Sequence, residues 1–450
     1  MAYTYITWLQ LQTRFFDRLG DQVFYTNTGT YPETTLYLRE ALRVWNVLAR
    51  FYRSRITFAT TANTAWYKIT DPTVVTNPAN QLNFTMTIRD VVAEMQIMFM
   101  EPVSPTAWTG TDMFTLDQLV QAVQRRHDQF LLETAVTVDR IYPVVGAISL
   151  EGRMDLPETV ADVRRVSWVD NGTLDRTQLW RRDEWGARSQ QFNWTLTPSD
   201  PPTGYSMSLV PPLGIQLIPP PSNAGHLDVL AVLNGPTLDT ALNTLISIPD
   251  DYVWALKYGA MADLLGQEGQ ARDHSRTKYC EERWKQGVAL ASLEPFIFNV
   301  MVNNVPVPVT NLQGLDSNAA GWENGTGTPD MAAAYRDMLT LNPIPDGVYG
   351  ITADILRPAP IPALPGDFVM LGPEQLDVIL DYAHHIAAFK EAGAEFNATQ
   401  RQLNNMIQLA GDHNNKLQAL AVFREVFEDR SNREDLRRPR REPSEVASAS

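Results

Sequence analysis

The chain has 450 residues, 44% of them hydrophobic, so it is long enough for two or three domains and too apolar to be disordered throughout. Its 52 acidic residues outnumber its 37 basic residues, and the formal net charge of −15 argues against a protein that coats DNA by neutralising phosphates. The charge is compatible with a soluble surface, or with an acidic wall past which DNA slides.

The first 150 residues are predicted to be mainly helical. Trp8, Leu11, Phe15 and Leu19 recur at steps of three and four residues, which predicts one face of a helix. Pro32 is expected to open a second helix, since proline is tolerated in the first turn. The first twenty residues lack the basic leader and apolar run of a signal peptide, so we expect synthesis in the cytoplasm. Further elements are predicted as a strand at 56–69 and helices at 88–99 and 116–132.

The middle of the chain changes character near Leu156-Pro157. Alternating apolar residues and frequent prolines predict a small antiparallel sheet over residues 154–235, and a helical hairpin is expected over 249–291. The remaining predictions are a strand at 296–310, a loop at 311–345 containing one short helix at Met331–Met338, a strand from Gly350, and helices from Pro373 to Phe427.

Two passages resemble each other when they are shifted by 124 residues. Each begins with proline and an acidic residue, continues with a Leu-X-Tyr motif and ends at a glycine, all of which have a helical explanation. A strand passage precedes each copy, beginning at Gly214 in the first and at Gly350 in the second. Shared capping rules explain some of these matches, so duplication is a hypothesis. The matched residues are Pro249 with Pro373, Asp250 with Glu374, Leu256 with Leu380, Tyr258 with Tyr382, and Gly269 with Gly393.

These patterns predict an α+β, mainly helical fold, with a helical bundle, small antiparallel β-domains and a duplicated strand-plus-αα-hairpin module. The predicted domains are a mainly helical region at 1–150, a β-plus-hairpin module at 151–292, a second and diverged module at 293–428, and a disordered charged tail at 429–450.

The sequence contains none of the common catalytic signatures. It has no P-loop, no dinucleotide GxGxxG, no GxSxG elbow, no HExxH and no CxxC. The neighbours His384 and His385 point to different faces of a helix, which favours core or interface packing over a metal site. Asp250 and Asp251 are interpreted as N-terminal helix charges, and the single Cys280 as a buried thiol. We therefore predict a protein that is not an enzyme and has no catalytic, cofactor or metal residues.

The candidate functional residues belong to protein interfaces. Aromatic residues are enriched at such interfaces, and a platform that stacks on sugars is the alternative for the tryptophans. The arginines of the C-terminal tail are interleaved with acidic residues, which favours protein docking or solvation over nucleic-acid binding. The candidates are Trp180, Trp185 and Trp194 near the predicted sheet, and Arg437, Arg438, Arg440 and Arg441 in the tail.

The passage 154–291 resembles the head-to-tail adaptor (neck or connector) proteins of tailed bacteriophages. The likeness is a pattern of proline and aromatic placements and covers about a third of the chain. The matching residues are Asp155-Leu156-Pro157, Val166, Glu184-Trp185, Pro202 to Tyr205, Gly214 to Pro219, Ile248 to Tyr252, and the small-residue helix Ala260 to Gly269.

The resemblance implies a structural virion protein in the neck or tail. Such a protein would form a twelve-fold ring beneath the portal protein, extend the DNA channel, receive the tail and grip the portal with a terminal arm. DNA would only pass through, and no membrane or cofactor is expected. The helical region before residue 150 and the block after residue 296 depart from the pattern and indicate an elaborated adaptor. The first alternative is another tail component, such as a nozzle or fibre-anchoring protein. A carbohydrate-binding or hydrolytic enzyme ranks below it.

Overall fold

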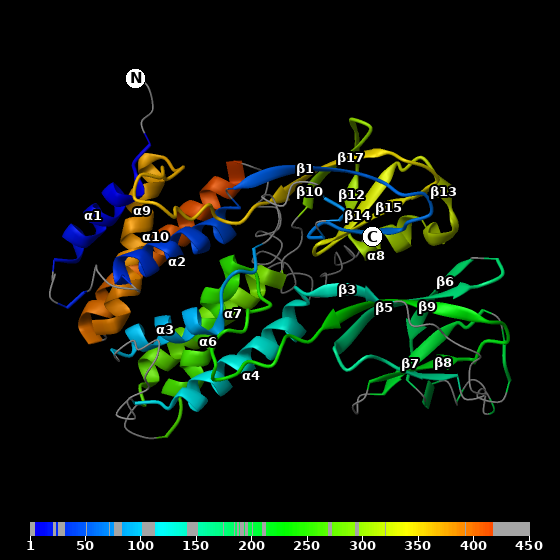
Figure 1. Ribbon diagram of the computed structural model, residues 1–450, viewed down its shortest axis with the longest axis horizontal. Helices are drawn as coiled ribbons and strands as arrows, with labels where there is room; N and C mark the ends of the chain where they lie inside the picture. Colours follow the sequence, from blue (N-terminus) through cyan, green and yellow to red (C-terminus); the bar gives the residue numbers. More distant parts are fainter. Residues whose placement is uncertain are drawn as a thin grey trace, which may run out of the picture.

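A computed structural model shows helices gathered at one end of the molecule and sheets at the other (Figure 1). The mixed α+β architecture agrees with the prediction. The structure describes residues 5–20, 24–25, 32–50, 52–71, 73–75, 83–100, 113–141, 152–173, 175–183, 185–186, 189, 193, 197–199, 201–208, 213–268, 272–292, 297–319, 321–391 and 393–416.

The helices form two groups that lie side by side (Figure 1). In one, α1 (Trp8–Leu19) and α2 (Glu33–Ala49) pack with the hairpin of α9 (Pro373–Glu391) and α10 (Gly393–Lys416). In the other, α3 (Ile88–Met98) and α4 (Leu116–Thr134) pack with the hairpin of α6 (Val253–Leu265) and α7 (His274–Ser292), which the short η3 (Asp250–Tyr252) precedes. Helices α1 and α4 lie at opposite outer edges of this region.

A seven-stranded sheet is attached to the second helical group. Its order is β3-β9-β5-β6-β7-β8-β4, with every pairing antiparallel except that of β6 with β7. Alternating side chains such as Val166, Trp168 and Val229 fill its core. The strands are β3 (Val138–Ile141), β4 (Arg153–Asp155), β5 (Val160–Asp170), β6 (Arg176–Arg181), β7 (Gly204–Ser208), β8 (Gly214–Ile218) and β9 (Gly225–Leu233).

Two four-stranded sheets belong to the first helical group, and they share one core between them. Their orders are β1-β17-β10-β11 and β12-β14-β15-β2. Two short strands, β13 and β16, form a separate pair. The elements are β1 (Arg53–Ala59), β2 (Trp66–Lys68), β10 (Ile297–Val302), β11 (Val305–Val307), β12 (Val309–Thr310), α8 (Leu312–Asn318), η4 (Trp322–Asn324), β13 (Thr326–Gly327), β14 (Met331–Tyr335), β15 (Met338–Asn342), β16 (Ile344–Pro345) and β17 (Gly350–Leu356).

The contacts divide the chain into two modules, one interrupting the other. The inner module runs from α3 to α7, and the outer module consists of α1 to β2 together with β10 to α10. The predicted domain boundaries at residues 150 and 292 cut the chain into consecutive stretches. The observed modules do not follow this order, because strands that are far apart in the sequence pair with each other. Strand β1 pairs with β17, about 300 residues further along the chain, so the N-terminal helices belong with the C-terminal hairpin.

The two modules share their element order and their strand register. In both, the strand after the second helix pairs antiparallel with the last strand before the hairpin. Arg53 pairs with Leu356 in the outer module and Val138 with Val232 in the inner one, so the two sides are related by shifts of 85 and 124 residues. The second shift equals the one found in the sequence. Both second helices also end in a left-handed residue, Arg50 or Ala135, at the same shift of 85.

The first helices of the modules are held in the same way. Thr7 and Thr87 each complete a capping box and each form an isolated bridge with the segment before the hairpin. Trp8 N–H donates to the Asp367 carbonyl in the outer module, and Ile88 N–H donates to the Thr244 carbonyl in the inner one. Helices α1 and α3 therefore correspond at a shift of 80 residues.

Three sequence predictions need correction. The helix expected at Met331–Met338 is the hairpin of β14 and β15, because both faces of this sheet are covered and tertiary packing outweighs the helix propensity of the alanine run. The strand expected at 56–69 is two strands separated by a turn at 62–63. In the inner module, the strand that corresponds to β17 is β9. The passage from Gly214, expected to correspond to the passage from Gly350, forms β8 instead.

The helices at 88–99 and 116–132 and the hairpin at 249–291 are confirmed as α3, α4 and α6–α7. Among the helices that the structure describes, none combines the length and apolarity needed to cross a membrane.

Candidate functional site

The predicted interface tryptophans separate into buried and exposed residues. Trp168 lies in the core of the seven-stranded sheet, where 1% of its surface is exposed. Trp180 on β6 and Trp185 just beyond it are 60% and 82% exposed. Large aromatic side chains so open to solvent are unusual and mark candidate contact sites. Trp194, the four tail arginines and the tail 429–450 lie outside the described residues.

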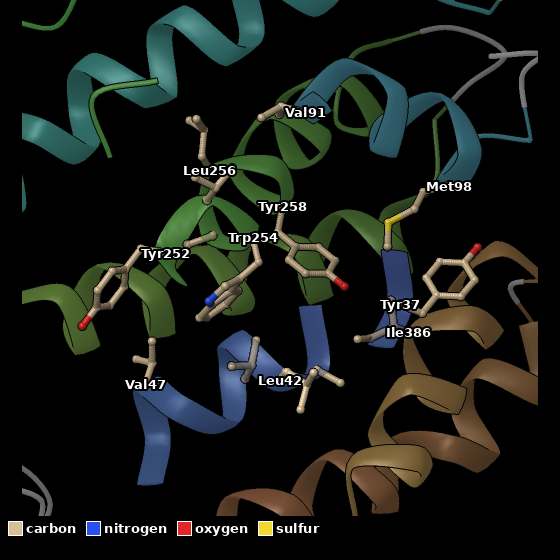
Figure 2. Packing of buried hydrophobic residues seen from close by; sticks show 14 of the residues in the cluster. Tyr37, Leu42, Val47, Val91, Met98, Tyr252, Trp254, Leu256, Tyr258 and Ile386 are labelled. Carbon is tan, nitrogen blue, oxygen red and sulfur yellow. The ribbon is translucent and has the colours of Figure 1, made fainter. Parts of the chain in front are cut away.

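The second candidate site is the seam, the contact between the two helical groups. Here α2 of the outer module lies against η3 of the inner module, Glu40 on α2 contacts Lys257 on α6, and α3 approaches α9. Figure 2 shows Leu42 and Val47 of α2 facing Trp254 and Tyr252 of the inner module. All four are buried, so the seam is continuous with the main hydrophobic core.

A buried charge cluster crosses the seam. The Lys257 ammonium on α6 donates to Glu40 on α2 and, over 2.9 Å, to Glu94 on α3. Only 2% of the lysine side chain and 4% of the Glu40 side chain are exposed. Burial acts to lower the pKa of Lys257, but the two carboxylates outweigh it and raise that pKa, so the lysine stays charged.

The aspartates Asp250 and Asp251 join the seam to two loops. Asp250 accepts hydrogen bonds from Thr85 and from Met86 N–H, just before α3. Asp251 accepts one of 2.6 Å from the Asn46 amide of the outer module and others from Ala359 N–H. Both lie at the N-terminal end of the hairpin, as predicted, and their main contacts are with other segments rather than with the helix itself.

The tyrosines of the repeated motif meet across the seam. The Arg283 guanidinium on α7 donates to the Tyr382 hydroxyl on α9, and it lies over the rings of Trp254 and Tyr258. Tyr258 and Tyr382 are fully buried. Cation–π stacking compensates for the loss of the arginine's hydration, so this buried charge has partners on both modules.

His385 is a buried polar contact of the seam. Its Nδ1 lies 2.9 Å from Thr399 Oγ1 and its Nε2 lies 3.0 Å from the Tyr279 hydroxyl of the inner module. Because the Thr399 hydroxyl also lies within bonding distance of the Phe396 carbonyl, we assign the proton of the neutral ring to Nδ1. Burial, together with the charge of Arg283, lowers the pKa of His385 to about 3. The histidine thus serves packing between modules, as predicted.

His385 and Asp251 predict opposite pH effects on stability. His385 favours the fold when neutral, so its contribution is lost as pH falls from about 6.5, at about 1.4 kcal/mol per pH unit. Burial raises the pKa of Asp251 to about 6, so its contribution is present at low pH and is lost as pH rises from about 4 to 6.

Urea unfolding between pH 4.5 and 7 should therefore separate the two groups. The His385→Gln variant should gain stability relative to the wild type as the pH falls, while Asp251→Asn should lose it. Parallel pH profiles for the wild type and both variants would contradict these assignments.

Sequence reasoning missed most residues of the seam. Lys257 is the one cation in the apolar helix VWALKYGAMADLL, and this was the available signal for a buried charge. No such signal marked its partners Glu40 and Glu94, because each lies on a helix in which polar and apolar residues are mixed.

A comparison with known protein families finds a match that spans the inner module. Residues 86–293 match the family model of the SU10 adaptor protein. This range begins just before α3 and ends just after α7, so it coincides with the inner module. The match covers less than half of the chain, so it shows that the inner module is similar to this adaptor family. No curated protein matches the chain.

Proposed function

We propose that the chain forms a ring at the head-to-tail junction of a tailed phage, links the portal protein to the tail and extends the DNA channel. The observation that carries this proposal is the coincidence of the matched range 86–293 with one complete structural module. A family match that ended inside a domain would be weaker support, since the matched unit could not fold alone.

We further propose that the outer module is a second, diverged copy of the same adaptor unit. The shared register at shifts of 85 and 124 residues supports this duplication, as do the paired capping boxes. The net charge of −15 suits a wall that DNA passes without binding. The partners in this proposal are further copies of the chain, the portal and a tail protein such as the nozzle, and the protein has no catalytic role in it.

Binding to purified portal protein tests the function. Wild-type chain mixed with portal should form a complex containing stacked rings, visible in negative-stain images. A variant lacking residues 429–450 should keep its fold and ring but lose portal affinity, because the arginine-bearing tail is the proposed arm. Wild-type protein that never binds portal or a tail protein would contradict the proposal.

The exposed tryptophans provide a second, independent readout. Trp180→Ala and Trp185→Ala should weaken binding to the neighbouring neck or tail protein by about 2 kcal/mol each while leaving thermal stability unchanged. Val348→Ser, at a position that is 77% exposed in the outer module, is the matched control. Binding by the tryptophan variants that equals the control would remove both residues from the interface.

A further inference from the structure

Around Lys257, the seam inside one chain joins unlike faces of the two corresponding modules. Here the outer module contributes α2 and the inner module contributes α3 and α6, while elsewhere in the seam α9 of the outer module contacts α7. The counterparts of these faces are α4 on the inner module and α1 with α9 on the outer module, by the shifts established above. A contact between unlike faces can repeat from copy to copy, and it closes a ring when the rotation permits.

Burial follows this pattern on the second helices. On α2, the side chains of Glu40 and Val47 are buried by the seam, where Glu40 contacts Lys257 and Val47 faces Tyr252. Their counterparts on α4, Arg125 and Leu132, are exposed, as is Gln118 two turns before Arg125. Helix α4 therefore presents to solvent the face that α2 uses to hold the next module.

The first helices of the two modules, α3 and α1, show the same difference in burial. On α3, Ala93 and Ile97 are 3% and 6% exposed, while their counterparts on α1, Thr13 and Asp17, are exposed. Apolar side chains lie exposed beside them, with Leu9 at 55% and Phe368 at 60%. Since solvent-exposed apolar groups of this size favour a partner, α1 has the character of an uncovered interface.

The charges of the seam recur at the two free faces with every sign inverted. Lys257 corresponds to Asp381 on α9, which pairs with Arg18 and whose side chain is 29% exposed. Glu40 corresponds to Arg125 on α4, whose side chain is 63% exposed. Glu94 corresponds to Arg14 on α1, which is exposed. A cation between two anions within the chain thus becomes an anion and two cations on opposite outer faces.

We propose that a second copy of this chain docks its α1 face (Leu9, Thr13, Arg14 and Asp381) onto the α4 face (Gln118, Gln121, Arg125 and Leu132), with Arg125 of one copy paired to Asp381 of the next. The contact repeats the seam between chains, so an assembly contains twice as many modules as chains. Sign inversion keeps the two kinds of junction distinct, because a seam surface that met a free face would bring like charges together. The ring rests on the proposed function, whereas the contact rests on the structure of this chain.

Charge exchange between full-length chains tests the contact. Arg125→Glu and Asp381→Lys should each raise the concentration needed for assembly by at least about tenfold, since like charges then meet at every junction. An equimolar mixture of the two variants should assemble again, because the two introduced side chains have opposite charges and pair at one junction, while the native pair forms at the next. Mass photometry over a concentration series measures all three cases.

Two further variants separate a loss of the contact from a loss of folding. Leu9→Glu alters a solvent-facing position, so it should block assembly with an unchanged thermal midpoint even if Asp381→Lys disturbs Arg18. Lys278→Glu on α7 is the control, since its side chain is 75% exposed and should leave assembly intact. Single charge variants that assemble like the wild type, or a mixture that assembles no better than its components, would overturn the contact. Failure of the proposed function would instead appear as wild-type assemblies that do not bind portal.

Discussion

Replacement of Lys257 by methionine should lower the free energy of unfolding by about 3–5 kcal/mol. The change removes the one ammonium that contacts both Glu40 and Glu94, and Glu40 is 3% exposed and largely shielded from water. A buried charge that loses its partner has little compensation, whereas the intact pair contributes modestly because its desolvation is already costly. Urea unfolding at pH 7 measures the loss.

A double variant shows whether the lost charge or the lost packing is responsible. Lys257→Met combined with Glu40→Gln removes most of the unpaired charge while it nearly preserves side-chain volume. It should recover more than half of the stability that the single variant loses. Equal losses for the single and double variants would show that packing, and not charge, controls the seam.

Replacement of Trp284 by alanine should cost about 3–5 kcal/mol, the range for large aromatic side chains removed from a core. Trp284 is 2% exposed, packs edge-on against Phe130 of α4 and lies beneath the Arg126 guanidinium. It also lies directly against Gly259 on α6, where a Cβ would overlap the indole ring. The tryptophan thus fixes the close crossing of α6 and α7 and their contact with α4.

The glycine beneath Trp284 provides a coupled test. Gly259→Ala should destabilise the wild type by about 1–3 kcal/mol through overpacking. In the Trp284→Ala background the same change should be neutral or stabilising, because the new methyl group enters vacated space. Gly411→Ala on α10, where no atom lies within 4 Å of the added carbon, should gain up to about 1 kcal/mol from helix propensity. Additive effects of the two α6–α7 substitutions would contradict the packing described.

Local sequence signals gave the hairpins and many single elements. Proline at Pro249 and Pro373 and the Leu-X-Tyr motif marked two similar helices, and the structure gives both tyrosines one shared partner, Arg283. Periodic apolar residues also located α3 and α4. These features depend on neighbours a few residues apart, so they are visible in one sequence.

The nested arrangement could not be predicted from such signals. The pairing of Ser54 with Ile355 joins segments that are separated by the whole inner module, and no local pattern records that partner. For the same reason the buried role of Glu40 stayed hidden, since its cation Lys257 lies on the other module. The alanine run at 332–334 led to a wrong prediction of a helix, because packing in the covered sheet outweighs the helix propensity of alanine.

The most direct test of the two-module account is a cryo-EM reconstruction of the assembled full-length protein. We expect a closed ring with twice as many helical groups as chains. Around it, the α2–α3 seam within each chain should alternate with an α4–α1 contact between chains. A ring in which α1 and α4 both face solvent, or in which α1 of one copy meets α1 of another, would contradict it.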